Sequence, residues 1–133
     1  MTIHLRRAIG CAAILLTLGG SGGVLARPAE QPETVMVTLH AKPGAADELA
    51  RVIAGHWATT RRLNLVHESP HLTLRGSEAG NQVYFVEIFT WRDAAIPDAA
   101  PEEIHKIWDE MNRLVESRGG HAGLEFSAMS VVP

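Results

Sequence analysis

The chain has 133 residues, a formal net charge of −3 at pH 7 and 46% hydrophobic residues. This length and composition indicate a single globular domain of ordinary size. A mildly acidic chain without clusters of lysine or arginine is a poor candidate for binding nucleic acid or anionic lipid. We therefore expect no nucleic-acid partner.

Residues 1–26 have the features of a secretory signal peptide. Two arginines precede the apolar run Ala8–Leu18, and Val24-Leu25-Ala26 carries residues of the sizes that signal peptidase recognises. We expect cleavage before Arg27 and a mature protein that is periplasmic or secreted. The alternative is a retained membrane anchor, which is disfavoured because the run is shorter than the ~20 residues that span a bilayer. We expect no stable membrane insertion after cleavage.

The predicted mature chain begins with a short leader and contains no cysteine. Cys11 is the only cysteine and would leave with the signal peptide, so we expect neither disulfides nor thiol chemistry. Residues 27–33 are rich in proline, glutamate and glutamine, which indicates a disordered leader. The folded domain is predicted over residues 34–133.

The hydrophobic pattern of this domain predicts six elements in the order strand, helix, strand, strand, helix, strand. We expect strands at Val35–His40, His71–Gly76, Val83–Trp91 and Leu124–Val132, and helices at Ala45–Leu63 and Pro101–Arg118. This βαββαβ order is typical of the α+β ferredoxin-like fold, in which a four-stranded antiparallel sheet carries both helices on one face.

Each predicted helix has an apolar stripe that should pack against the sheet. The first stripe includes His56 and Trp57, and the second includes Trp108. Lys42-Pro43-Gly44 forms the turn before the first helix, and Gly119-Gly120 is expected to end the second.

The two middle strands are predicted to form a hairpin whose two faces differ in chemistry. If Leu74 pairs with Tyr84, one face is apolar and is expected to lie under the helices. His71 then lies opposite Glu87 on the other face. That face is both aromatic and charged, so we expect it to contact a second subunit. Its aromatic residues are Phe85, Phe89 and Trp91.

Several segments resemble the dimeric α/β-barrel superfamily, and in particular its antibiotic biosynthesis monooxygenase-like domains. They are Lys42-Pro43-Gly44, His56-Trp57, Leu63-Asn64-Leu65-Val66, Phe85–Trp91, Ile107–Met111 and Leu124-Glu125-Phe126. The resemblance covers about residues 34–132. It implies a homodimer in which two sheets close into a barrel, with a pocket for a small aromatic or quinol-like ligand between sheet and helices.

The activities of that superfamily differ between its members. Some oxygenate their substrates without a metal or organic cofactor, others bind or degrade haem, and some have no known activity. The haem-degrading members carry an Asn on the first strand and a His around the second helix. This chain has no Asn in Val35–His40, and Trp108 stands where that His is expected. We therefore disfavour haem degradation and expect no cofactor.

His56 is the leading candidate for a catalytic base, because an imidazole within a buried stripe can accept a proton from a phenol at neutral pH. The alternative is a core histidine satisfied by one hydrogen bond. In the functional interpretation Trp57, Tyr84 and Trp108 line the substrate pocket. The alternative for the tryptophans is plain core packing.

His71 and Glu87 form the second candidate, an acid/base pair in which the carboxylate orients the imidazole. The alternative is a polar pair that sets the register of a dimer. Arg75 and His40 either join this network as substrate-binding residues or are solvated at strand ends. No histidine pair has the helical or short spacing, with an added carboxylate, of a zinc or iron site. We expect no metal.

Two functions remain open. The first is an exported, homodimeric, cofactor-independent monooxygenase acting on a quinol or another small aromatic. The second is a non-catalytic ligand-binding or interaction module of the same fold. A catalytic site needs a base that faces a cavity, whereas a binding module needs only the cavity.

The signal-peptide interpretation can be tested by the intact mass of the exported protein. We expect protein recovered from the periplasm or medium to begin at Arg27 and to contain no cysteine. Full-length chain in the membrane fraction would contradict the predicted cleavage.

Overall fold

The computed structural model describes residues 29–133. The predicted signal peptide lies outside the described residues. The elements are β1 (Glu33–His40), α1 (Ala46–Arg62), β2 (Val66–Glu78), β3 (Gln82–Trp91), a 3₁₀ helix η1 (Pro97–Ala99), α2 (Glu102–Leu114) and β4 (Leu124–Met129). The predicted ferredoxin-like order is confirmed.

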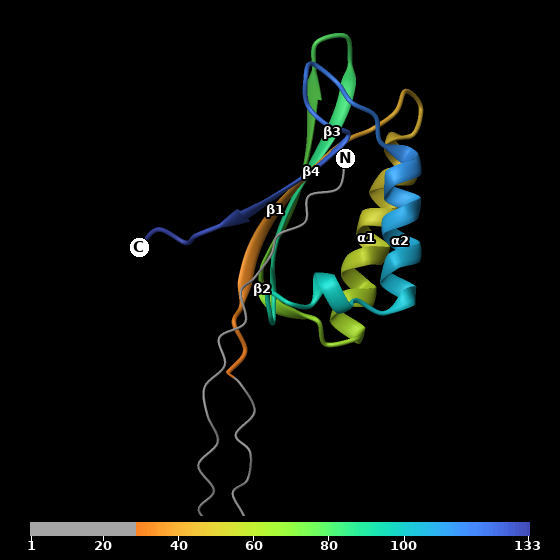
Figure 1. Cartoon of the computed structure of the whole chain (residues 1–133). Coiled ribbons are helices and arrows are strands. Elements are labelled where there is room, and N and C mark those ends of the chain that lie inside the picture. Colours follow the sequence, from red (N-terminus) through yellow and green to blue (C-terminus); the bar gives the residue numbers. More distant parts are fainter. Residues whose placement is uncertain (1–28) are drawn as a thin grey trace, which may run out of the picture.

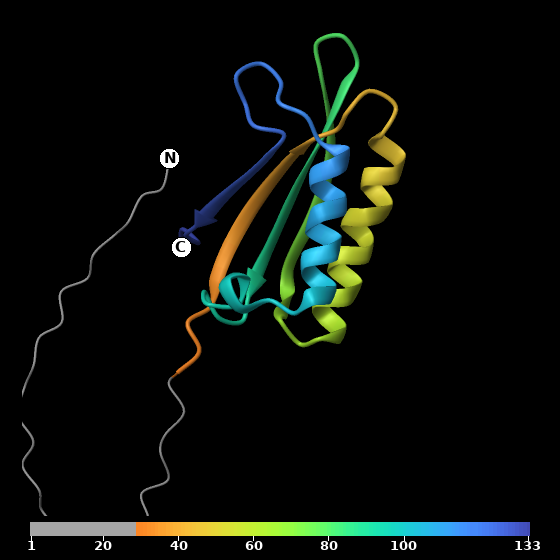
Figure 2. The same cartoon turned by 45° about the vertical axis from the view of Figure 1, so that its right-hand side comes forward.

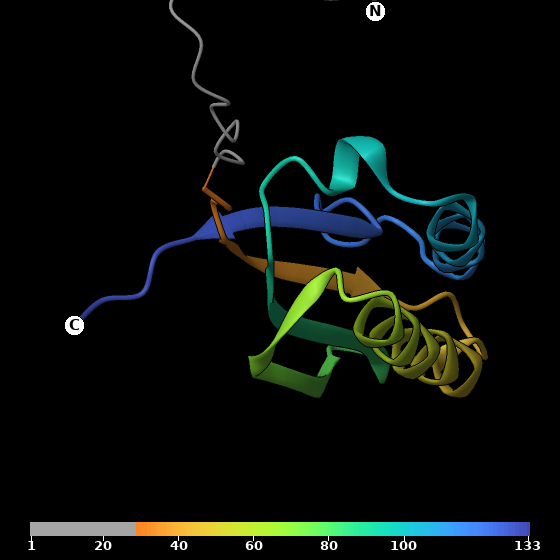
Figure 3. The same cartoon turned by 90° about the horizontal axis from the view of Figure 1, so that it is seen from below.

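The four strands form one antiparallel sheet in the order β2-β3-β1-β4. Both helices lie on the same side of this sheet (Figures 1 and 2). Figure 3 shows α1 on the side of β2 and β3, and α2 on the side of β1 and β4. Neither helix in residues 29–133 is long and apolar enough to cross a membrane.

The helices cover the aromatic face of the sheet, so the predicted orientation of the sheet was wrong. Phe85, Phe89 and Trp91 are buried under the helices instead of facing a second subunit. They pack with side chains of β1 on the same face, such as Val35. Glu87 is two residues from both Phe85 and Phe89 along β3. It therefore shares their face of the sheet and is buried with them.

The other face of the sheet is aliphatic and is left uncovered by the chain. Leu72 and Leu74 on β2 are 47% and 49% exposed. Val86 and Ile88, their partners on β3, are half-buried. The sheet therefore places Phe85, Phe89 and Trp91 under the helices and a mainly aliphatic surface outside.

The β2–β3 register differs by two residues from the predicted one. Leu74 pairs with Val86, and Thr73, in place of His71, lies opposite Glu87. The pairing of Glu78 with Gln82 leaves a turn over residues 79–81, in which Gly80 and Asn81 have positive φ. Because the shift is two residues, it does not change which side chains of β2 and β3 lie on the same face of the sheet.

Helix α2 ends at Leu114, four residues before the predicted boundary. The Lys42 N–H donates to the Leu114 carbonyl, and Val115 then forms a β-bridge with Ala41. These bonds to the end of β1 compete with further helical turns. The two glycines that were expected to end α2 instead lie in the following turn, where Arg118 pairs with His121.

The remaining bounds differ at strand ends. β2 begins at Val66 instead of His71, with an irregularity in its pairing between these two residues. β4 ends at Met129 instead of Val132. β1 begins at Glu33, so it overlaps the predicted leader.

Asp93 holds the chain just before β1. The backbone N–H groups of Ala95 and Gln31 donate to its carboxylate, and these bonds lower the pKa of Asp93.

The orientation of the sheet can be tested with two Phe→Ala variants in urea unfolding. Phe89 is 1% exposed and Phe126, on the edge strand β4, is 51% exposed. We expect Phe89→Ala to lower the free energy of unfolding by about 3–5 kcal/mol. Phe126→Ala should cost only about 1–1.5 kcal/mol because half of the ring is already in water. Equal losses would contradict the burial of the aromatic face.

Candidate functional site

A cavity of about 310 Å³ lies between the sheet and α2, toward the edge strand β4. Its size suits a small ligand, and its wall is largely apolar, as in most small-molecule sites. The lining residues are Val37, His56, Glu87, Phe89, Trp91, Pro97, Trp108, Met111, Asn112, Leu124 and Phe126.

Three elements bring the polar groups of this cavity together. His56 belongs to the buried stripe of α1, Glu87 to the covered face of β3, and Trp108 to the sheet-facing side of α2. The helical period of about 3.6 residues and the strand period of two aim all three side chains into the layer between helices and sheet. His56 and Glu87 are both almost fully buried.

The hydrogen bond from Trp108 defines the protonation of His56. The indole Nε1 of Trp108 lies 3.2 Å from His56 Nε2. Because an indole N–H can only donate, Nε2 must accept and carries no proton. The imidazole is then neutral with its proton on Nδ1, which lies 3.8 Å from Glu87 Oε2. The Glu87 carboxylate thus lies beside the Nδ1 side of the ring, at a distance too long for a hydrogen bond.

Glu87 has a second histidine on its other oxygen. His71 Nε2 lies 3.4 Å from Glu87 Oε1, although the two residues are not paired across the strands. They are diagonal neighbours on one face, a separation that long side chains bridge. The His71 ring stacks on Trp57, with centroids 3.6 Å apart and an angle of 4° between the planes. The structure therefore brings His71 and Glu87 together, although neither His71 nor Trp57 lines the cavity.

Three buried polar atoms at the cavity have no hydrogen-bond partner among the described residues. They are His56 Nδ1, Glu87 Oε1 and Trp91 Nε1. Buried polar groups are nearly always satisfied by protein, water or ligand, so the unpaired indole N–H of Trp91, which lines the cavity, favours a polar occupant. Trp91 lines the cavity, although it was not predicted to be a pocket residue. The period of two that links it to Glu87 and Phe89 is the signal that would have placed it there.

Tyr84 was predicted to line the pocket and does not. It lies on the open face of the sheet, across from Gly76. A Cβ at Gly76 would come within 2.3 Å of the Tyr84 ring, so the ring packs flat against this glycine. A residue of even number on β3 faces away from Glu87, and Tyr84 is therefore separated from the cavity by the sheet.

Arg75 and His40 were predicted to join the network, and both lie elsewhere. Arg75 is exposed and pairs with Asp47 of α1 at 3.2 Å. His40 is buried at the other end of the sheet. Its Nδ1 lies 3.1 Å from the Ala122 carbonyl oxygen, and its Nε2 lies 3.2 Å from Glu78 Oε1. These contacts hold the α2–β4 loop to the β2–β3 hairpin.

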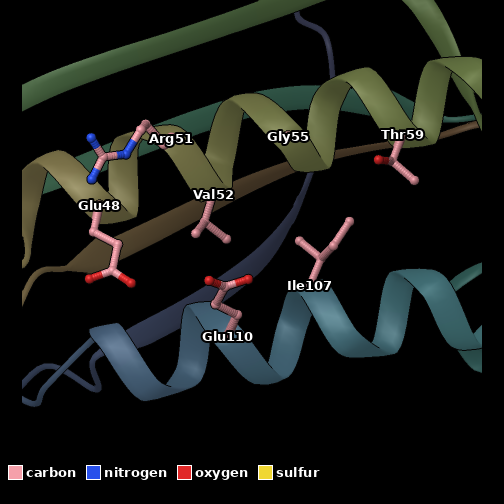
Figure 4. A pocket seen from close by; sticks show the side chains of 7 residues that line it. All are labelled: Glu48, Arg51, Val52, Gly55, Thr59, Ile107 and Glu110. Atoms are coloured by element: carbon pink, nitrogen blue, oxygen red, sulfur yellow. The ribbon is translucent and has the colours of Figure 1, made fainter.

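A second hollow of about 440 Å³ lies between the two helices, away from the sheet. In Figure 4, side chains of both helices project toward the space between them, among them Val52 of α1 and Ile107 of α2, whereas Arg51 lies along α1. Its charged residues Glu48, Arg51 and Glu110 are all exposed, and Glu48 already pairs with Arg113. In residues 29–133 no three metal-ligating side chains are grouped closely enough to hold an ion. The buried cavity is the stronger candidate site.

Solved structures with the same fold include antibiotic biosynthesis monooxygenases. One such enzyme has a TM-score of 0.57 and 20% identity, over 76% of this chain and 99% of its own. SnoaB, a cofactor-independent oxygenase from Streptomyces nogalater, has a TM-score of 0.56 and 18% identity, over 75% and 92%. A putative antibiotic biosynthesis monooxygenase from Bacteroides thetaiotaomicron has a TM-score of 0.52 and 18% identity, over 79% and 93%. No protein-family model and no curated protein matches the chain.

The tautomer of His56 can be tested with two Trp→Phe variants. Trp108→Phe removes the N–H that donates to His56 Nε2, whereas Trp91→Phe removes an N–H that has no partner within residues 29–133. In ¹⁵N NMR spectra we expect the Nδ1–H form in the unchanged protein and in Trp91→Phe. Trp108→Phe should show a mixture of tautomers. An unchanged tautomer in Trp108→Phe would contradict the assigned hydrogen bond.

Proposed function

We propose that this chain, which has the fold of antibiotic biosynthesis monooxygenase-like proteins, is an exported enzyme that oxygenates a small phenol or quinol without a cofactor. The observation that carries the proposal is a buried base beside a largely apolar cavity, with His56 backed by the carboxylate of Glu87. The fold neighbours support the same class of chemistry, since SnoaB is described as a cofactor-independent oxygenase.

The proposed reaction begins with a proton transfer to His56. A hydroxyl of the substrate replaces the Trp108 indole at His56 Nε2 and gives that nitrogen its proton. The Glu87 carboxylate stabilises the imidazolium through Nδ1–H. The electron-rich phenolate then passes one electron to molecular oxygen. The resulting substrate radical and superoxide combine through a new carbon–oxygen bond, and Phe89 and Trp108 shield this step from water.

The second candidate is a binding module that uses the same cavity without chemistry. It is favoured by the hydrogen bond from Trp108, because this bond already satisfies His56 Nε2 as in an ordinary core histidine. The two candidates agree on ligand binding in the cavity. They differ in whether binding of a phenol leads to consumption of oxygen.

Substitution of His56 separates the two candidates. We expect the metal-free protein to consume oxygen with a phenol or quinol. His56→Ala should lower turnover by ~10²-fold or more, the usual contribution of a general base, while tryptophan fluorescence still reports ligand binding. Leu124→Trp, which fills the cavity, should abolish binding as well.

The control for this comparison is His121→Ala, because His121 is exposed and lies outside the cavity. It should leave turnover unchanged. Binding without oxygen consumption across a broad panel of phenols and quinols would favour the binding module. Absence of binding in the unchanged protein would contradict both candidates.

We also propose that the chain forms a homodimer through the open face of the sheet. The resemblance implies sheet-to-sheet dimers, and the aliphatic surface around Leu72 and Leu74 is the face that the helices leave uncovered. This replaces the aromatic face as the expected interface.

Light scattering tests the dimer with two variants that each add one glutamate. Leu74→Glu places a charge in the proposed interface, where removal from water is costly, and should give a monomer. Ala54→Glu, on the exposed side of α1, should leave the dimer intact. A monomeric unchanged protein at micromolar concentration would contradict the proposal.

A further inference from the structure

We infer that His71 is a positioning residue that neutralises the buried charge of Glu87 and connects the site to solvent. The inference rests on the proposed function, in which Glu87 must be ionised to stabilise a protonated His56. It assigns a task to a histidine that does not line the cavity and that the proposed reaction does not otherwise use.

The Glu87 carboxylate is buried, and an ionised carboxylate is costly to bury without a partner of opposite charge. The Glu87 side chain is only 2% exposed, and two groups of opposite potential charge lie near it, His56 on α1 and His71 on β2. An ionised carboxylate in such a place is stable only when it is paired or hydrogen-bonded. One of the two histidines must therefore supply the positive charge if Glu87 is ionised.

His56 does not supply this positive charge in the resting state. Its Nε2 accepts the Trp108 N–H and so carries no proton. An imidazolium would need protons on both ring nitrogens and would point one of them at the indole N–H. The neutral state of His56 is also the one that a general base requires.

The groups in contact with the His71 ring bear on its charge. Its Nε2 faces Glu87, and its ring lies flat on Trp57. The face of an indole attracts a cation. Among residues 29–133, Arg61 is the arginine or lysine recorded over this indole, 5.9 Å from the ring centroid, and its charge is paired with Glu68 at 2.7 Å. A positive charge on His71 would therefore lie between a carboxylate and the face of an indole.

Of His71, His56 and Glu87, His71 is the side chain most accessible to water. The His71 side chain is 24% exposed, against 5% for His56 and 2% for Glu87. His71 is thus the member of this series that exchanges protons with water directly. When His56 Nε2 takes a proton from the substrate and becomes positive, release of one proton from His71 to solvent restores the charge balance around the ionised Glu87.

The protonation states can be measured by ¹⁵N NMR without a substrate, so the result does not depend on the proposed activity. At one fixed pH we expect His71 to have protons on both ring nitrogens and His56 to have one, on Nδ1. Glu87→Gln should lower the protonated fraction of His71 severalfold. The matched control is Glu125→Gln, which removes the carboxylate beside His121 at the other end of the sheet and should leave His71 unchanged.

A neutral His71 in the unchanged protein, or a doubly protonated His56, would overturn the inference even if Glu87→Gln fails to fold. Kinetics provide the second test. His71→Gln should lower kcat by roughly 10-fold, less than the loss expected at His56, and change the pH profile while KM stays the same. A change in KM alone would overturn the positioning role. Correct protonation states in a protein without turnover would leave this charge assignment intact and refute the proposed reaction.

Discussion

The burial of the Glu87 carboxylate is the constraint on which the site depends. Glu87 lies between Phe85 and Phe89 on the face of β3 that is covered by the helices. A residue at such a position is ordinarily apolar. Replacing a buried ionic group by apolar residues of similar volume is often neutral or stabilising. The polar series from Trp108 through His56 and Glu87 to His71 is therefore poorly explained by stability alone. It is well explained by a reaction or a ligand that needs a base in an apolar cavity.

The fold supplies the geometry that this series requires. Each of its four residues comes from a different element, and only the packing of α1 and α2 on one face of the sheet brings them together. The same packing leaves the cavity open toward the edge strand β4. It also leaves the aliphatic face free, so the proposed dimer interface and the proposed site lie on opposite sides of the sheet. Substitutions on one side can therefore be made without contact with the other.

Much of this arrangement could be predicted from residue periodicity. The order of elements, the burial of His56 and the closeness of His71 to Glu87 follow from patterns of 3.6 and two residues. The covered face could not be predicted, because both faces of the β2–β3 hairpin carry apolar side chains and alternation does not say which one meets the helices. Because the helices cover the face of β3 that carries Trp91, Trp91 lies at the site and Tyr84 does not. Arg75 and His40 were misplaced because periodicity within a strand does not reveal their partners, Asp47 in the first turn of α1 and Glu78 at the end of β2.

The central claim is that the cavity beside His56 is a ligand site and not a packing defect. A crystal structure of the protein soaked with phenol tests it most directly. We expect a phenol ring held among Phe89, Trp91 and Trp108, with its hydroxyl oxygen about 2.6–3.2 Å from His56 Nε2. A cavity that stays free of phenol, or that is closed in the crystal by the side chains of Phe126 and Met111, would contradict it.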